Sequence, residues 1–463
     1  MTGTGSGTDN DRFSMSTAPH RSVSHSQSLC RVALVGFGTV GQSVARILTA
    51  HPPPGVQLTH IFNRRVARKK ADWIPADVQW TEDIEDVFAA PVEIVIELVG
   101  GLEPAGTWAR RTLTSGRSFV TANKQLIAHH GSELQTLAAR HGGELRFEGS
   151  VAGGIPILSA LRDGLVADRI WRVSGILNGT CNFILTSMED HGASFADALA
   201  QAQALGYAEA DPTDDVEGLD ARAKLAILCG TALRADVGPP RIAARSIRVV
   251  EAVDFLHARR LGCTIRQIAQ AEWDAAEDGV LHAAVRPALV ATDSPLARVA
   301  GSQNIVLLRG HYGGETIFSG SGAGGGPTSV AVVSDVAAIA RQRAAAPVAD
   351  ARLTEVVPAL ASPNAARVPR SITGEFVTPH YLRFIVRDRP GIIAAIAGAM
   401  ERHAINIDAV LQLPADSKDE LPFVVTVERC PSAVLSSAVA DIGRLDFHVQ
   451  PPVDLPILGG PPA

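Results

Sequence analysis

The first third of the chain alternates between short apolar runs and helical patterns of hydrophobic positions. Cys30–Val35 is a mostly apolar run typical of a buried parallel strand, and Gly36 follows it directly. Further strands are expected at 57–62, 93–98, 118–122 and 144–147, and helices at 42–50, 83–89, 103–115 and 131–141. Strands and helices in this alternation predict an α/β fold with a parallel sheet.

The pattern changes twice further along the chain. From residue 156 it is more mixed, with helices expected at 156–164, 194–205 and 217–233. Residues 346–378 carry Ala and Pro and few strong patterns, so we expect a linker there. From residue 380 a compact module follows, in the order strand, helix, strand, strand, helix, strand. Residues 1–28 are rich in Gly, Ser and Thr and predict a disordered tail without the apolar core of a secretory signal.

Composition and charge exclude several classes of protein. The 463 residues predict roughly three domains, at about 150 residues each. A formal charge of −6 argues against a nucleic-acid binder, which would present a basic face. No stretch approaches the ~18 apolar residues of a membrane span. The five cysteines are scattered and odd in number, which favours a cytoplasmic protein over one built on disulfides or a metal site.

A glycine-rich loop follows the first strand. Gly36-Phe-Gly38-Thr39-Val40-Gly41 matches the G-x-G-x-x-G pattern between a strand and a helix, as in a Rossmann-type domain. The first Gly permits a tight turn, the second lets a pyrophosphate approach the backbone, and the third lets the helix pack closely. The helix N-terminus then presents free N–H groups to the phosphates. The alternative is a tight turn that binds no ligand.

Basic residues stand where the second strand ends. An enzyme that prefers NAD would carry Asp or Glu there to bind the ribose 2′-hydroxyl. This chain has Arg64 and Arg65 instead, followed by further basic residues. The pair favours the 2′-phosphate of NADP(H) over NAD(H). The alternative is a solvated basic run.

Three segments follow later strands, at the sheet edge where open α/β sheets bind ligands. Val99 stands beside two glycines, which leave room for a cofactor. Lys124 ends Thr121-Ala-Asn-Lys124 and is placed to reach substrate or cofactor. Glu148 precedes a Gly-rich turn whose carbonyls suit a hard cation, although the segment alone is more typical of a hinge.

The most informative stretch runs from Glu209 to Lys224 and is rich in acids. The next helix is expected to start near Glu217, so that Glu217, Asp220 and Lys224 share one stripe. The helix is apolar nearly all round, which indicates burial. A partly buried Lys beside carboxylates is a candidate general acid or base. The alternative is a surface salt bridge.

Together these residues resemble the homoserine dehydrogenase family. The matching segments run in the family's order over about 30–345: 36–41, 121–124, 175–182, 209–224 and 320–328. Residues 379–458 look like an ACT domain. The resemblance implies a Rossmann domain at 29–155 with a return segment at 325–345, and an α+β substrate and dimerisation domain at 156–324.

The resemblance also implies a reaction and a set of residue roles. The reaction is the interconversion of L-homoserine and L-aspartate 4-semialdehyde with NAD(P). Glu209 and Asp220 would hold the substrate's amino and hydroxyl groups, while Lys124 and Lys224 surround the reacting oxygen and Lys224 donates the proton. Further residues expected to bind substrate are Asn178, Gly179, Thr180 and Asp215. Gly322 and Gly324 are expected by the nicotinamide with Val99 and Lys124, and Glu148 with the carbonyls of Val151, Gly153 and Ile155 implies a site for Na⁺ or K⁺.

The C-terminal module carries candidate regulatory residues. Asp388 is expected to cap a helix that starts at Pro390 and buries its isoleucines, including Ile393. Gly391 would leave the first turn open for an amino-acid carboxylate, and Asn406 would bond the ligand from the next strand. The ACT resemblance implies threonine as effector and at least a dimer. The alternative is a dimerisation module that binds nothing.

Two other functions compete with this interpretation. One is a semialdehyde dehydrogenase with Cys181 as nucleophile, although no His is positioned by the sequence to activate it. The other is a non-catalytic protein that senses NADP and amino acids. The joint presence of Glu209, Asp220 and Lys224 favours catalysis.

Overall fold

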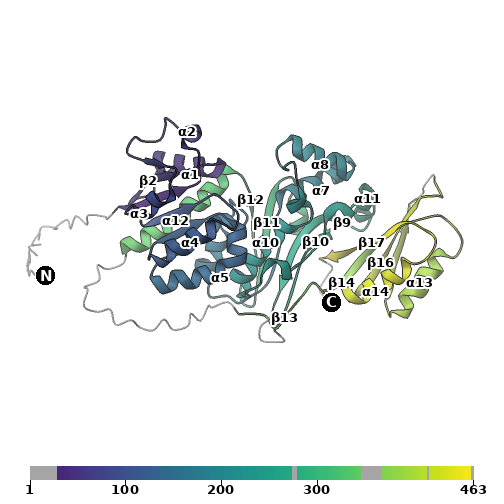
Figure 1. Ribbon diagram of the computed structural model, residues 1–463. Helices are drawn as coiled ribbons and strands as arrows, with labels where there is room; N and C mark the ends of the chain where they lie inside the picture. Colours follow the sequence, from purple (N-terminus) through teal and green to yellow (C-terminus); the bar gives the residue numbers. More distant parts are fainter. Residues whose placement is uncertain (1–28, 274–278, 346–366, 414–416, 460–463) are drawn as a thin grey trace, which may run out of the picture.

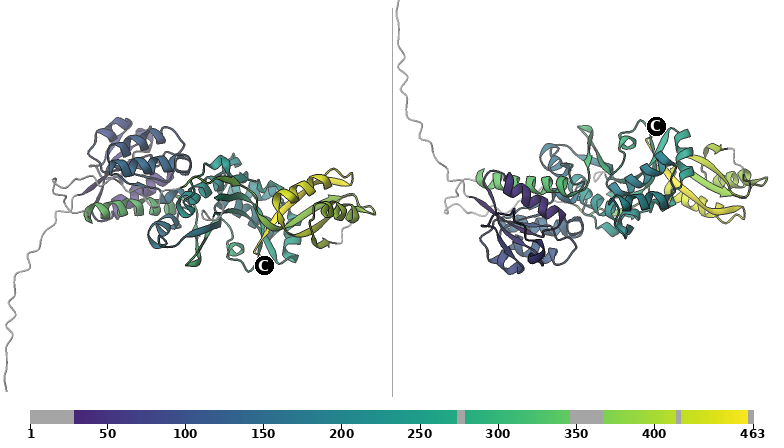
Figure 2. Two further views of the ribbon diagram at one scale, coloured as in Figure 1. Left: turned by 90° about the horizontal axis from the view of Figure 1, so that it is seen from below. Right: turned by 90° about the horizontal axis from the view of Figure 1, so that it is seen from above.

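The computed structural model describes residues 29–273, 279–345, 367–413 and 417–459 (Figure 1). The expected tail at 1–28 and most of the expected linker lie outside these residues. The two views of Figure 2 show an elongated molecule, with the N-terminal domain at one end, the C-terminal module at the other and the middle domain between them.

The N-terminal domain is built on a parallel sheet of six strands in the order β3-β2-β1-β4-β5-β6. The strands are β1 Cys30–Val35, β2 Val56–Phe62, β3 Gln79–Thr81, β4 Ile94–Glu97, β5 Ser118–Thr121 and β6 Leu145–Arg146. The helices are α1 Thr39–Ala50, α2 Val66–Lys69, α3 Ile84–Ala89, α4 Ala105–Thr114 and α5 Lys124–His141. This strand order is that of a Rossmann domain, so the predicted fold is confirmed. Helices α1 and α5 start earlier than predicted, the latter because the Asn123 side chain caps it by accepting from Leu126 N.

The chain returns to this domain through the long helix α12, Gly325–Ala345. Figure 1 shows α12 beside α1, and Val332, Val336 and Ile339 share a core with Val32 and Leu34 of β1. The return segment expected at 325–345 thus corresponds to α12.

The middle domain is a mixed sheet covered by helices. Its strands are β7 Ile170–Ile176, β8 Ala243–Ala244, β9 Cys263–Glu272, β10 Val280–Ala291, β11 Gln303–Gly310 and β12 Gly314–Ser321. Its α-helices are α6 Ile157–Ser159, α7 Gly179–His191, α8 Phe195–Ala204, α9 Thr213–Val216, α10 Leu219–Leu228 and α11 Ala252–Arg260. Short 3₁₀ turns are η1 Glu148–Ser150, η4 Pro239–Arg241, η5 Ile247–Val249 and η6 Pro295–Arg298, and π-helical turns are η2 Ala160–Gly164 and η3 Cys229–Leu233.

The helix predicted at 217–233 is interrupted at its start. Gly218 has φ 77°, in the left-handed region, so α9 stops before it and α10 begins at Leu219. The side chain of Glu217 therefore leaves the stripe of Asp220 and Lys224, and that part of the prediction is wrong.

The C-terminal module has the predicted order: β14 Val377–Val386, α13 Ile392–Arg402, β15 Ile407–Gln412, β16 Leu421–Pro431, α14 Ser432–Ile442 and β17 His448–Leu458. Helices α13 and α14 pack on one face of its antiparallel sheet (Figure 1). The βαββαβ arrangement expected of an ACT domain is confirmed.

This module is joined to the middle domain by backbone pairing. Strand β17 pairs with β10 at Leu289–Ile457 and Val290–Leu458, which makes one sheet of eleven strands. Strand β13, Ser371–Thr373, also pairs with β10. The last part of the stretch predicted as a linker, 346–378, is thus part of the sheet, and that part of the prediction is wrong.

Candidate active site

The glycine loop has the geometry that a dinucleotide needs. A Cβ at Gly41 would lie 2.2 Å from Gly36 O, so only glycine lets α1 pack this closely. A Cβ at Gly38 would meet nothing within 4 Å, so the loop is open on that side. Thr39 and Val40 are the first residues of α1, where backbone N–H groups have no partner within the helix. The loop therefore offers an anion site at a helix N-terminus.

A pocket of about 620 Å³ lies against this loop. Gly36, Gly38 and Val99 line it, and so do Arg64 and Arg65 together with Arg68 and Lys69. Both arginines are exposed, and within the described residues neither guanidinium has a hydrogen-bond partner. The pocket therefore fits an adenine nucleotide, and its lining is basic where the sequence predicted a 2′-phosphate site.

A buried carboxylate that the sequence analysis missed supports the loop after β4. Glu97 accepts hydrogen bonds from Val99 N at 2.7 Å and Gly100 N at 2.9 Å. Its other oxygen accepts from Thr121 Oγ1 at 2.7 Å. Glu97 thereby ties the ends of β4 and β5 together at the edge of the pocket. The sequence did carry a signal for this role, because Glu97 is an acid in the otherwise apolar strand β4.

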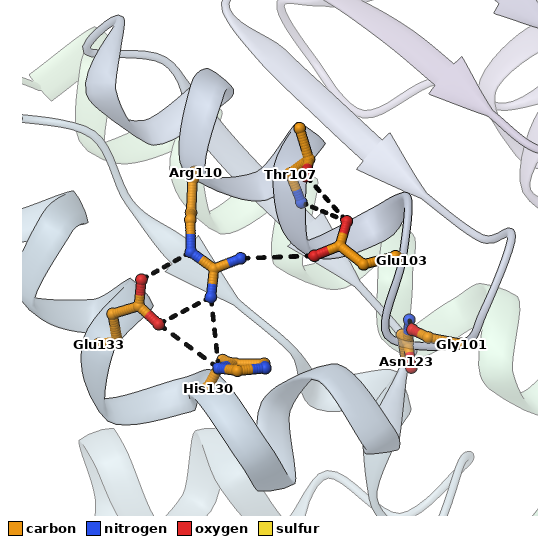
Figure 3. A network of polar contacts seen from close by, with 7 residues as sticks. All are labelled: Gly101, Glu103, Thr107, Arg110, Asn123, His130 and Glu133. Carbon is orange, nitrogen blue, oxygen red and sulfur yellow. Dashed lines mark hydrogen bonds and ion pairs between the residues drawn. The ribbon is translucent and has the colours of Figure 1, made fainter.

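Further polar contacts, from α4 and α5, hold the same loop between β4 and α4 (Figure 3). Arg110 of α4 forms an ion pair with Glu133 of α5 at 2.6 Å. Asn123 Nδ2 donates to Gly101 O at 2.6 Å while its Oδ1 caps α5. Lys124 is therefore fixed as the first residue of α5, directly beside this loop.

Two lysines meet one buried aspartate between the first two domains. Asp220, 5% exposed, lies on α10. Lys224 Nζ donates to Asp220 Oδ2 at 2.7 Å and to Leu177 O at 2.8 Å. Lys124 Nζ, from the nucleotide-binding domain, lies 2.8 Å from Asp220 Oδ1. The structure thus brings the two predicted catalytic lysines onto opposite oxygens of one carboxylate.

Asn178 links this cluster to the acidic segment 209–217, which is called the acidic loop here. Its Nδ2 donates to Asp215 Oδ1 at 2.6 Å and to Asp220 Oδ2 at 2.9 Å. Its Oδ1 accepts from Cys181 N at 2.8 Å and so caps α7. Gly179 packs so closely on the backbone that a Cβ there would lie 2.6 Å from Ser302 O. Gly179 and Thr180 are the first residues of α7, where backbone N–H groups have no partner within the helix.

The charges in the cluster are strongly coupled. Burial would raise the pKa of Asp220, but the ammonium groups of Lys224 and Lys124 together hold it well below its usual range. Burial would lower the pKa of Lys124, but Asp220 raises it overall. Burial raises the pKa of Asp215, helped by the charge of Asp220 and opposed by the hydrogen bond from Asn178. Asp220 is therefore an anion held between two cations.

One predicted site residue lies apart from this cluster. Glu209 is exposed, and among the described residues its carboxylate makes no hydrogen bond or ion pair; its backbone oxygen accepts from Gln203 Nε2. Thr180 Oγ1 donates to Tyr207 O at 2.7 Å, and the same hydroxyl also contacts Asp215, where it opposes the rise in that group's pKa. Thr180 is therefore joined to the cluster through Asp215.

The carboxylate of Glu148, predicted as a cation ligand, caps the start of α6. Its oxygens accept from Leu158 N at 2.8 Å and Ser159 N at 2.6 Å, at the start of α6. The described residues contain no group of three or more His, Cys, Asp or Glu suited to a metal. A cation here would therefore depend on backbone carbonyls.

The glycines expected beside the nicotinamide lie where the chain re-enters the first domain. A Cβ at Gly153 would lie 2.8 Å from Gly322 O, so these two turns are in contact. Gly322 also packs on Asn304, whose buried amide has no hydrogen-bond partner in the described part of the chain. Gly324 has φ 115° and immediately precedes α12.

Cys181 is unsuited to be a nucleophile. The thiol is fully buried, and burial raises its pKa well above the ordinary value. Its Sγ donates to Asp215 O at 3.1 Å. A protonated thiol in the core is inert, so the structure contradicts the reading of this chain as a cysteine-dependent semialdehyde dehydrogenase.

The start of α13 differs from the prediction. The helix begins at Ile392, after Gly391 with φ 94°, and Asp388 forms an ion pair with Lys418 at 3.2 Å instead of capping it. Ile393 is 45% exposed, so it is not part of the core. A Cβ at Gly391 would meet nothing within 4 Å, and Asn406 Nδ2 donates to Glu428 Oε2 at 3.1 Å.

No helix in the described part of the chain is long and apolar enough to cross a membrane.

Comparisons with known proteins agree with this geometry. Residues 36–148 match the model of the homoserine dehydrogenase NAD-binding domain, 156–337 that of homoserine dehydrogenase, and 380–447 that of the ACT domain. The chain is 38% identical to a homoserine dehydrogenase of Synechocystis over 83% of this chain and 89% of that protein. It is 35% identical to that of Bacillus subtilis over 86% and 90%.

Solved structures show the same similarity. A homoserine dehydrogenase from Thiobacillus denitrificans is 34% identical, with a TM-score of 0.83 over 92% of this chain and 97% of that one. A hyperthermophilic archaeal homoserine dehydrogenase in complex with NADPH is 28% identical, with a TM-score of 0.58 over 68% of this chain and 98% of that one. The chain therefore belongs to the homoserine dehydrogenase family, as an oxidoreductase with a nicotinamide-cofactor domain and a C-terminal ACT domain.

Proposed function

We propose that this protein interconverts L-homoserine and L-aspartate 4-semialdehyde in the biosynthesis of threonine, methionine and isoleucine, with NADP(H) preferred over NAD(H). The observation that carries the proposal is the pair of lysines on one buried aspartate, between the nucleotide domain and the acidic loop. The nicotinamide, when bound, exchanges the hydride with the carbon that bears the reacting oxygen.

The lysines manage the charge and the proton at that oxygen. In the direction of reduction, the Lys224 ammonium stabilises the developing alkoxide and donates the proton to it. Lys124 approaches from the opposite domain and adds a second positive charge. Asp220 keeps both lysines oriented and accepts a hydrogen bond from the substrate hydroxyl.

The acidic loop and the N-terminus of α7 recognise the amino-acid end of the substrate. Asp215 and Glu209 provide negative charge for its ammonium group. The backbone N–H groups of Gly179 and Thr180, at the start of a 13-residue helix, suit its carboxylate. The buried amide of Asn178 fixes Asp215 relative to Asp220.

The cofactor preference rests on the basic lining of the nucleotide pocket. Arg64 and Arg65 are exposed there, and guanidinium groups bind phosphate through charge-assisted hydrogen bonds. The NADPH complex of the archaeal relative is consistent with this choice. For the monovalent cation we propose the carbonyls of Val151, Gly153 and Ile155 as ligands, because the Glu148 carboxylate is engaged elsewhere.

We further propose that threonine binds the ACT domain near Asp388, Gly391 and Asn406 and thereby inhibits the enzyme. We also propose that the enzyme is cytoplasmic. The open backbone at Gly391 supports this site. Strand β15 lies at the end of the eleven-stranded sheet and offers an edge for pairing with a second copy in a homodimer. Threonine at millimolar concentration should inhibit the full-length chain, and Asn406→Ala should weaken that inhibition while Gln412→Ala on β15 does not.

One assay tests the enzymatic proposal directly. The purified chain should reduce NADP in the presence of L-homoserine, and less efficiently NAD. A chain that binds NADP but shows no homoserine-dependent reduction with either cofactor would instead be the non-catalytic sensor.

A further inference from the structure

The acidic loop is held from outside the active site by a segment that also contacts the ACT domain. This segment, Ala243–Val249, is called the strap here. It comprises β8 and η5 and runs along β10, where Ala243 pairs with Ala284 and Arg245 N donates to Val285 O at 2.8 Å.

On its active-site side, the strap contacts the turn between α9 and α10. Glu217 Oε1 lies 3.1 Å from Ser246 Oγ and accepts from Arg248 Nε at 3.2 Å. A Cβ on the intervening Gly218 would lie 3.8 Å from Ala244 Cβ, so the backbone of the turn packs on the strap. This turn separates Asp215 from Asp220 and therefore sets the distance between the two acids.

On its other side, the strap is bound by two strands of the ACT domain. Arg245 Nη1 donates to the carbonyl oxygen of Asp454 on β17 at 2.6 Å and to its carboxylate at 3.1 Å. Arg383 of β14 donates through Nη2 to Val249 O at 3.3 Å. The strap thus lies between the ACT domain and the acidic loop and contacts both.

The ACT end of this connection is rigid. Arg383 is only 3% exposed and forms an ion pair with the fully buried Asp254 of α11 at 2.5 Å. Tyr381 Oη donates to the other oxygen of Asp254 at 2.7 Å. Separating a buried charge from its partner costs several kcal/mol of stability. We therefore expect Arg383, Asp254 and Tyr381 to keep their relative positions.

We propose that Glu217 is a positioning residue for homoserine binding, and that the ACT domain holds it in place through Arg245 and the rest of the strap. Glu217 does not touch the lysine cluster; it acts by fixing the turn that carries Asp215 and Asp220. The proposal rests on the proposed function in that homoserine is the ligand of this loop.

The test measures KM for homoserine, KM for NADP and kcat for the full-length chain and its variants. Arg245→Gln removes the link to Asp454 and should raise KM for homoserine by roughly 2- to 30-fold, the range seen for residues that couple distant sites. KM for NADP should change little, and Arg245→Lys should restore part of the loss. Arg309→Gln is the matched control, because it breaks an Arg–Glu pair on β11 and β12 outside the strap.

A double-mutant cycle makes the test specific. Glu217→Gln should raise KM for homoserine. In the double variant with Arg245→Gln, the rise in KM, expressed as a free energy, should be smaller than the sum of the two single-variant values. If Arg245→Gln does not fold, Ser246→Ala, which removes the hydroxyl's contacts with Glu217 and Val216 O and its cap on Arg248 N, should show the same pattern. Unchanged KM for homoserine, an equal rise in KM for NADP, or full additivity would overturn the proposal. A wild-type chain without homoserine oxidation would refute the proposed function instead.

Discussion

Replacing Lys224 with alanine tests the assignment of the proton donor. The change removes the ammonium that donates to Asp220 at 2.7 Å and to Leu177 O at 2.8 Å. A charge-assisted hydrogen bond is worth about 1.5–3 kcal/mol. Since about 1.4 kcal/mol changes a rate tenfold, loss of one such interaction in the transition state lowers kcat roughly 10- to 150-fold. Loss of proton donation adds to this, so we expect a decrease of about 10²-fold or more.

Stability should suffer less than catalysis. Breaking a buried ion pair outright costs about 3–5 kcal/mol. Asp220 keeps Lys124 at 2.8 Å in the variant, so its charge remains paired and the loss in unfolding free energy should be smaller. KM for NADP should barely change, because Lys224 lies on α10, away from the glycine loop.

Steady-state kinetics at saturating homoserine, with thermal unfolding alongside, provide the measurement. Lys224→Arg is the matched control: it keeps the positive charge, but arginine does not release a proton, so it should fold normally and remain slow. An alanine variant within a few-fold of wild type would show that the pair on α10 is a structural salt bridge and would refute the assignment.

Three further outcomes are expected. Replacing both Arg64 and Arg65 with serine should raise KM for NADP far more than KM for NAD, since each arginine loses a charge-assisted bond of roughly 1.5–3 kcal/mol to the 2′-phosphate. Lys70→Ser is the control. Equal effects on both cofactors would show that the two arginines belong to a solvated basic run that binds no phosphate. Cys181→Ser should retain activity, because the buried thiol donates to a backbone carbonyl and a hydroxyl can do the same. Burial raises the pKa of Asp335 to about 7, so its contribution to stability is full below its ordinary value of 3.8 and is lost as pH rises through about 7. The Asp335→Asn variant keeps an acceptor for Glu148 N but has no proton to lose. The free energy of unfolding of this variant should therefore decline less than that of wild type between about pH 5 and about pH 8. Parallel declines in the two proteins would contradict the argument.

What could be predicted from the sequence was mainly local. The roles of Gly36, Gly38 and Gly41 follow from a six-residue turn between a strand and a helix, and the structure has that turn. Asp220 and Lys224 are four residues apart on one helix, so their contact follows from helix geometry. These predictions needed no knowledge of how the domains pack.

The errors arose where one residue's backbone or a distant partner decides the outcome. Nothing in the pattern of hydrophobic residues reveals that Gly218 adopts a left-handed conformation, and this alone moves Glu217 out of the stripe. The sequence likewise did not reveal the partners of the Glu148 carboxylate, two N–H groups about ten residues later, because they depend on where α6 begins. The buried pair of Asp254 and Arg383 joins residues 129 apart in sequence and carries no local signal.

The pairing of β10 with β17 also has a consequence for how the chain is made. Strand β17 follows every other described element in sequence, so it leaves the ribosome after them. Until then, the end of β10 at Leu289 and Val290 is an open edge, and the core that Leu455 of β17 shares with Ile265 and Tyr381 is incomplete. Open edges and unfilled cores are where nascent chains aggregate. The nucleotide domain has its own separate sheet, but its helix α12 also comes late, so both halves of the enzyme mature only after most of the chain has been synthesised.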